Sequence, residues 1–187
     1  MNLKKVAVRS SAVCEDGKNN SYAGQFETFL NVDRCNLIDS VKKCFKSNEA
    51  DNIKGYIEEK NIINDNTNVS VIVQEMIDGE ISGVMFTCSP ITQENEIIIE
   101  FVYGLGEKLV QGEETPIQII VNKDTFEIKI NYKRGQDITY KEEKKFKELA
   151  EIGIEIEKIY RMPQDIEWTI KNNEIFILQT RNITNIK

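Results

Sequence analysis

The residues best suited to chemistry gather near the C-terminus of this chain, in two short segments joined by a Lys-Asn-Asn-Glu connection at 171–174. Segment 163–170 alternates apolar and polar residues with a period of two, which predicts a strand buried on one face. Segment 176–181 is a second run rich in β-branched and aromatic residues, and the Asn-Asn pair can supply the positive φ of a tight turn. The two segments predict a β-hairpin that presents acidic side chains on one face.

Three side chains of this hairpin suggest a site for a metal ion and phosphate. Glu167 and Gln179 lie on the two strands. A facing carboxylate and amide oxygen suit a hard cation such as Mg²⁺, which keeps water and binds phosphate through its remaining positions. Arg181 lies two residues beyond Gln179, hence on the same face, where its planar guanidinium could donate hydrogen bonds to a phosphate oxygen. The alternative is an ordinary edge hairpin with solvated charges, since exposed acids on strands are common.

Composition limits the classes of protein to consider. With 187 residues and 40% hydrophobic residues, the chain can form one full core or two small lobes. Its net charge of −7 argues against a general nucleic-acid binder, which needs a basic surface to neutralise a phosphate backbone. No run reaches the roughly 18 apolar residues of a membrane span, and no signal sequence is evident. We therefore expect a cytoplasmic protein that binds neither nucleic acid nor membrane.

The four cysteines and the absence of histidine exclude several kinds of site. Cys14, Cys35, Cys44 and Cys88 show no CxxC spacing, so free thiols are expected rather than a zinc site. Without histidine, the chain cannot form Ser-His or Cys-His nucleophile arrangements, nor carry a phosphohistidine itself.

The N-terminal segment predicts two strands around a polar loop. A short strand over 6–11 leads into a Gly- and Asn-rich loop over 14–21, and period-two alternation continues to Val32. Arg9 and this loop could together hold a polyphosphate, because small residues such as Gly24 let backbone N–H groups approach an anion. The spacing does not match a P-loop, and a plain surface loop between two strands is the alternative.

The middle of the chain predicts packing elements and a surface for a base. Strands over 69–77 and 81–87 are expected to form a hairpin. On this hairpin, Met76 and Met85 could form an adaptable apolar surface for adenine, although methionines are more often core residues. The backbone near Gln74 could contact the adenine edge. The other expected elements are amphipathic helices over 36–60, a strand over 96–103, two strands within 117–131 and a helix over 142–160. Without repeats or linkers, they predict a single α+β domain over 1–187.

Four ordered motifs of this chain resemble a known family. They are VRSSAVCEDGKNNSYAGQFETFLNV, VIVQEMIDGEISGVMFT, GLGEKLVQGEETP, and PQDIEWTI followed by ILQTRNIT. They are similar to the ATP-grasp nucleotide-binding domain of the phosphoenolpyruvate synthase, pyruvate phosphate dikinase and rifampin phosphotransferase family. The resemblance implies an α+β, ATP-grasp-like lobe with a largely antiparallel sheet and packed helices, and it implies ATP and Mg²⁺ as ligands.

The resemblance also implies roles for individual residues. The nucleotide-binding positions are Arg9, Gly24, Thr28, Gln74 and Arg181. Within this set, the two arginines contact phosphates and are the catalytic candidates. The metal-binding positions are Glu167 and Gln179, which lie twelve residues apart. The chain departs from the family at Asn182, where proline is common, and at 13–14, but neither change removes a ligand.

The resemblance covers only the second lobe of the ATP-grasp clamp. Family members also have an N-terminal lobe with a phosphate-binding lysine and a domain whose histidine carries the phosphoryl group. We therefore expect an ATP- and Mg²⁺-binding lobe of a phosphoenolpyruvate synthase-like phosphotransferase, which needs these parts as partners because in-line transfer requires groups from several directions. The alternatives are a lobe of a rifampin phosphotransferase-like enzyme, or a non-catalytic module that kept the fold.

Overall fold

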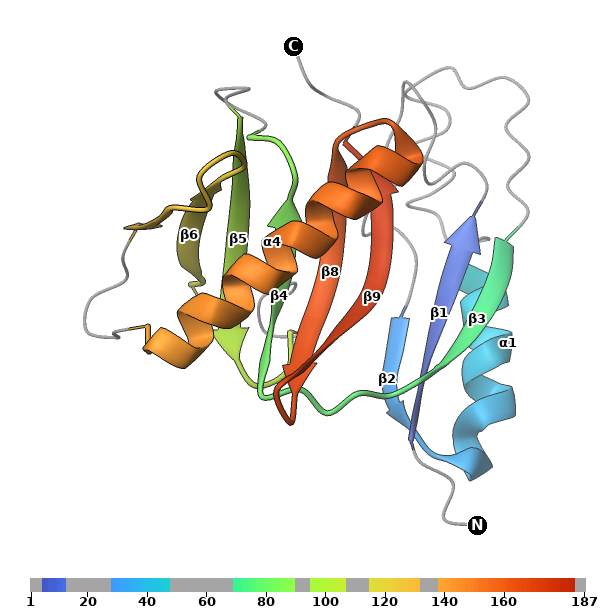
Figure 1. Cartoon of the computed structure of the whole chain (residues 1–187). Coiled ribbons are helices and arrows are strands. Elements are labelled where there is room, and N and C mark those ends of the chain that lie inside the picture. Colours follow the sequence, from blue (N-terminus) through green and yellow to red (C-terminus); the bar gives the residue numbers. More distant parts are fainter. Residues whose placement is uncertain are drawn as a thin grey trace. The chain divides into compact units, whose positions relative to one another are not determined.

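The computed structural model describes residues 5–12, 28–47, 69–89, 95–106, 115–131 and 138–183. The chain divides into two compact units, Met1–Met76 and Ile77–Lys187, each with its own sheet (Figure 1). The single domain expected over 1–187 stays a prediction, and each unit is described by itself.

The first unit is a three-stranded antiparallel sheet with the order β2-β1-β3 and a helix against one face. Its elements are β1 (Val6–Ala12), β2 (Thr28–Val32), the 3₁₀ turn η1 (Arg34–Asn36), α1 (Leu37–Ser47) and β3 (Val69–Glu75). Val8, Val32 and Cys44 are buried together, and the Cys44 thiol donates a 3.6 Å hydrogen bond to the Val8 carbonyl oxygen. Because side chains alternate along a strand, Ala7 and Arg9 project from the face of β1 opposite to α1.

A β-bulge in β2 changes which of its residues face α1. Val6 pairs with Val32 but Val8 pairs with Phe29, so β2 holds an extra residue, and Asn31 takes a φ of 55°. Phe29 and Val32 therefore both contact the core under α1. The simple alternation expected over this segment, which put Phe29 and Val32 on opposite faces, is wrong because a bulge reverses the phase of the strand.

The second unit is a six-stranded antiparallel sheet with the order β7-β6-β5-β4-β8-β9. Its strands are β4 (Ile81–Phe86), β5 (Glu96–Tyr103), β6 (Ile117–Asn122), β7 (Ile128–Asn131), β8 (Gln164–Lys171) and β9 (Glu174–Asn182). One long helix, α4 (Tyr140–Tyr160), crosses one face of this sheet (Figure 1). The expected α+β class, with largely antiparallel sheets and packed helices, is confirmed.

The expected hairpin of strands 69–77 and 81–87 is wrong. β3 pairs along its whole length with β1, whereas β4 pairs with β5 and β8. The two apolar strands are adjacent in sequence but belong to different sheets. Their pairing partners lie more than ten residues away along the chain, where local turn signals carry no information about pairing.

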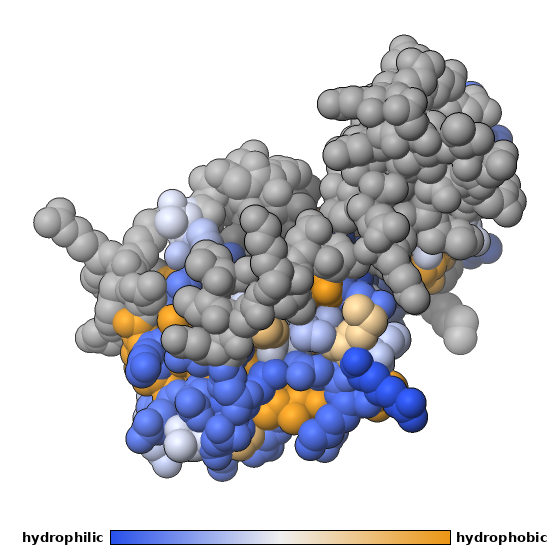
Figure 2. Space-filling model, turned by 90° about the horizontal axis from the view of Figure 1, so that it is seen from above, coloured by the Kyte–Doolittle hydropathy of each residue, from blue (hydrophilic) through white to orange (hydrophobic). Residues whose placement is uncertain are grey.

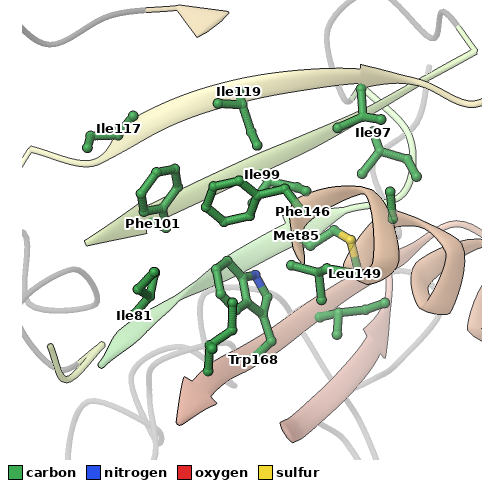
Figure 3. Close-up of a cluster of buried hydrophobic side chains, with 14 residues drawn as sticks. Ile81, Met85, Ile97, Ile99, Phe101, Ile117, Ile119, Phe146, Leu149 and Trp168 are labelled. Carbon is green, nitrogen blue, oxygen red and sulfur yellow. The ribbon is translucent and has the colours of Figure 1, made fainter. Parts of the chain in front are cut away.

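The core of the second unit lies between the sheet and α4. Phe101, Phe146 and Trp168 are fully buried there, with the rings of Phe101 and Phe146 4.7 Å apart between centroids (Figure 3). Buried and half-buried residues alternate along β6, and burying each large side chain contributes about 1.5–3 kcal/mol. The opposite face of this sheet, turned away from α4, is called the open face below.

The ends of α4 are defined by local interactions. Thr139 caps its N-terminus in a reciprocal pair of hydrogen bonds with Glu142, and Arg161 ends it with a left-handed φ of 57°. Lys123, in the β6–β7 turn, donates two hydrogen bonds of 2.8 and 2.9 Å to the Glu157 carboxylate. These contacts fix α4 along the sheet that carries the C-terminal hairpin.

On the face seen in Figure 2, the described residues are largely hydrophilic, with smaller hydrophobic areas between them. None of the helices in the described ranges is long and apolar enough to span a membrane. Cys35 and Cys88 are free thiols, as expected, the Cys44 thiol is hydrogen-bonded to Val8, and Cys14 lies outside the described residues.

Candidate functional site

The C-terminal hairpin forms as the sequence predicts. β8 and β9 pair from Lys171 and Glu174 outward, around a two-residue turn in which Asn172 has a φ of 50° and Asn173 a φ of 62°. Positive φ at both central residues is the geometry that joins two twisted strands tightly, and asparagine tolerates it better than most residues.

A β-bulge sets the pairing of the two candidate metal ligands. Trp168 pairs with Ile177, but the next residue of β8, Glu167, pairs with Gln179, so β9 holds one extra residue at Leu178. Ile177 packs against the core, so the bulge reverses the phase of β9 and Gln179 joins Glu167 on the open face. The expected juxtaposition of Glu167 and Gln179 is therefore present, half-buried on both strands.

Arg181 lies on the same face, in an ion pair. It is opposite Asp165, and its Nε donates a 2.8 Å hydrogen bond to Asp165 Oδ2. Both side chains are mostly buried, at 23% and 16% exposed. The Asp165 carboxylate thus holds the guanidinium over the end of the hairpin, next to the paired Glu167 and Gln179.

Asp165 is the residue that sequence reasoning left without a role. Burial raises the pKa of this carboxyl, the Arg181 charge and hydrogen bond oppose the rise, and the Glu167 charge adds to it. Among the described residues, Asp165 Oδ1 is buried without a hydrogen-bond partner. The period-two pattern of the sequence already places Asp165 on the same face as Glu167. Only the ion pair with Arg181 shows that Asp165 orients this arginine.

The first unit brings together three of the other candidate residues. Thr28, Arg9 and Ile72 are directly opposite one another across β2, β1 and β3, and Gln74 pairs with Ala7 two residues along. Opposed residues project from the same face, so Arg9, Thr28 and Gln74 share the face turned away from α1, with Arg9 and Gln74 about 7–8 Å apart on the diagonal. Gly24 lies outside the described residues.

The methionine surface expected for adenine does not form as predicted. Met85 is fully buried in the core of the second unit, against Gly153 of α4, because its position in β4 faces the helix. Met76 is half-buried at the end of the first unit and is not paired with Met85 in a hairpin. Gln74 remains a candidate because it shares a face with Arg9.

The oxygen donors on the open face suit Mg²⁺, which takes some of its ligands from water and phosphate, better than a metal ion bound only by protein side chains. Across the described ranges, no three His, Cys, Asp or Glu side chains are grouped to hold a metal ion. Mg²⁺ is usually bound by one or two carboxylates with water and substrate phosphates completing its octahedron. One carboxylate, one amide oxygen and a nearby guanidinium match a metal that arrives with a phosphate ligand.

Comparison with known proteins shows which family shares these features. The model of the family described as pyruvate phosphate dikinase, AMP/ATP-binding domain matches residues 1–187. The chain belongs to this family. It is 36% identical over 206 residues to a probable phosphoenolpyruvate synthase of Methanocaldococcus jannaschii and 38% identical over 205 residues to one of Archaeoglobus fulgidus. A rifampicin phosphotransferase of Bacillus cereus is 33% identical over 205 residues.

The chain spans only a small part of the length of those relatives. The alignments cover 97%, 97% and 96% of the chain but only 17%, 27% and 23% of the three relatives, in the same order. The structure of a D-alanine-D-alanine ligase from Helicobacter pylori aligns with the chain at a TM-score of 0.43 and 12% identity. The alignment covers 97% of the chain and 43% of the ligase. That similarity is too low to carry an argument.

Proposed function

We propose that this chain is the ATP- and Mg²⁺-binding lobe of a phosphoenolpyruvate synthase-like phosphotransferase. The observation that carries the proposal is the pairing of Glu167 with Gln179 on the open face, beside Arg181, in a chain of an AMP/ATP-binding domain family. Glu167 and Gln179 would hold Mg²⁺ through side-chain oxygens, and the metal would supply charge neutralisation for the triphosphate. Arg181, oriented by Asp165, donates to a phosphate oxygen.

The first unit contributes nucleotide contacts. Arg9 binds the phosphates, Thr28 and Gly24 belong to the strand and loop that close over the nucleotide, and Gln74 lies on the strand beside adenine. What supports this part of the proposal is the shared face of Arg9, Thr28 and Gln74.

Transfer of the phosphoryl group requires more groups than those named so far. The chain has no histidine, so the acceptor histidine belongs to a separate domain, and a further lobe supplies the phosphate-binding lysine. Relatives named for phosphoenolpyruvate synthesis and for rifampicin phosphorylation match the same residues, so the proposal names no final acceptor.

Calorimetric titration with ATP, in the presence and absence of Mg²⁺, tests the proposal. With Mg²⁺ we expect a Kd of roughly 0.1–1 mM, because one lobe provides only some of the contacts. Glu167→Gln should weaken binding roughly tenfold or more with Mg²⁺ and leave metal-free binding nearly unchanged. Glu174→Gln, an exposed glutamate at the turn of the same hairpin, is the matched control. Unchanged Mg²⁺ dependence in Glu167→Gln would contradict the proposal and favour solvated edge charges.

A further inference from the structure

A second carboxylate–amide pair lies on the same row of the open face as Glu167 and Gln179. Glu100 of β5 pairs with Gln118 of β6 on one side and with Val84 of β4 on the other, and Val84 pairs with Glu167. Across β6, β5, β4, β8 and β9 the row reads Gln118, Glu100, Val84, Glu167 and Gln179, and it continues to Asn131 of β7. Two Glu–Gln pairs thus flank a single valine.

Gln118 fixes the position of Glu100. Its Nε2 donates a 2.8 Å hydrogen bond to Glu100 Oε1. β6 lies on the side of β5 away from β4 and β8, so this bond holds Oε1 toward β6 and leaves Oε2 to accept from another donor. Both side chains are half-buried, which strengthens the effect of a fixed charge on its surroundings.

The spacing of the strands decides how Glu100 can act on the metal site. Neighbouring strands lie about 4.8 Å apart, so the Cα atoms of Glu100 and Glu167 are about 9.6 Å apart across β4. Direct ligation requires an oxygen about 2.0–2.1 Å from Mg²⁺, and the bond to Gln118 draws Glu100 away from Glu167. A water molecule bound to the metal would span the remaining distance.

We propose that Glu100 binds the metal through water: its carboxylate accepts a hydrogen bond from a water molecule of the Mg²⁺ held by Glu167 and Gln179, and Gln118 positions it for this. The inference rests on the function proposed above and adds a residue to that site. Mg²⁺ sheds its water reluctantly, so a carboxylate placed for its hydration shell favours Mg²⁺ specifically. Partners that act through a ligand in this way typically contribute ten- to hundredfold in metal affinity.

The test is a titration of ATP binding to the full chain at Mg²⁺ concentrations from zero to several millimolar. Glu100→Gln should raise the Mg²⁺ concentration for half-maximal effect about tenfold. Metal-free ATP binding should stay unchanged or tighten, since a negative charge near the triphosphate is removed. A merely structural role for Glu100 would weaken ATP binding both with and without Mg²⁺. Gln118→Met should shift the Mg²⁺ dependence in the same direction by less, because Glu100 remains but is no longer held.

Glu96→Gln is the matched control. Glu96 lies on the same strand and the same face as Glu100, four residues away, and its nearest cation is Lys129 at 3.9 Å. It should behave as the wild type. If Glu100→Gln matches Glu96→Gln while Glu167→Gln loses its Mg²⁺ dependence, the inference is overturned and the proposed function stands. If Glu167→Gln also keeps full Mg²⁺ dependence, or if the wild type binds ATP equally with and without Mg²⁺, both are overturned.

Discussion

Glu167 lies opposite Gln179 because β9 accommodates one residue more than β8. The two-residue turn alone would put Leu178 opposite Glu167, as the regular pairing from Lys171 and Glu174 to Trp168 and Ile177 shows. The bulge at Leu178 moves the amide into that position and turns it away from the core.

Exchanging Leu178 and Gln179 tests whether the bulge stays at position 178. The double variant Leu178→Gln, Gln179→Leu keeps the composition of β9 but places leucine opposite Glu167. We expect it to lose the Mg²⁺ dependence of ATP binding to the same extent as Gln179→Leu alone, measured by calorimetry. Wild-type Mg²⁺ dependence in the exchanged variant would mean that the register slides by one residue and that the bulge does not select Gln179.

Removing Arg181 should destabilise the fold through Asp165. Arg181→Ala leaves a carboxylate buried without its cation, which costs about 1–3 kcal/mol. Replacing both partners with Asp165→Ala, Arg181→Ala should recover part of that loss, because no uncompensated charge remains. Urea unfolding of both variants and of Asp165→Ala gives the coupling energy. Equal stability of Arg181→Ala and the wild type would show that the pair does not stabilise the fold.

The Asn-Asn turn should tolerate glycine but not alanine. Asn173 has a φ of 62°, and a residue with a β-carbon other than asparagine or aspartate pays roughly 1 kcal/mol in that conformation. Asn173→Ala should therefore lower the free energy of unfolding by about 1 kcal/mol, while Asn173→Gly should change it little. Thermal or urea unfolding distinguishes the two, and a reversed order would contradict the assigned turn geometry.

Tyr103 should make stability depend on pH in the alkaline range. Burial, and then the hydrogen bond and charge of Glu142, raise the pKa of Tyr103 from 10.0 to about 12. The folded state therefore retains a proton that the unfolded state releases, so this contribution is complete below pH 10 and is lost as pH rises toward 12. The stability difference between wild type and Tyr103→Phe should be constant up to about pH 10 and then fall.

Urea unfolding from pH 8 to 11.5 measures that difference. Glu142→Gln removes the charge that helps to raise the pKa, so in this background the decline should begin at a lower pH. A wild-type-minus-Tyr103→Phe difference that stays flat over the whole range would contradict the interaction between Tyr103 and Glu142.

The chain by itself should neither turn over ATP nor form a phosphoenzyme. It contains no histidine to carry a phosphoryl group, and losing even one well-placed charge donor typically slows an enzyme by about 10²–10³. Incubation with radiolabelled ATP should leave the chain unlabelled. Added protein with an N-terminal lobe and a histidine domain of this family should become labelled, and Glu167→Ala or Arg181→Ala should abolish this. Release of ADP or AMP by the chain alone, sensitive to either substitution, would identify a minimal enzyme.

Much of the candidate site could be predicted from local patterns because its parts depend on neighbouring residues. The alternation around Glu167, the Asn-Asn turn and the return strand through Arg181 are short-range features, and they predicted the hairpin correctly. The motifs pointed to the family that the comparison then showed. Arg9 and Thr28 are positions that the family resemblance implies, and the register puts them side by side.

Only the tertiary structure decided which strands pair and where a register slips. The sequence determined that 69–77 and 81–87 are strands, but their placement in different sheets depends on pairing with distant residues of β1, β5 and β8. It also determined that Glu167 and Gln179 lie on neighbouring strands. Their meeting on one face depends on the bulge at Leu178, because a period-two pattern specifies alternation within a strand and not the point at which one extra residue reverses it.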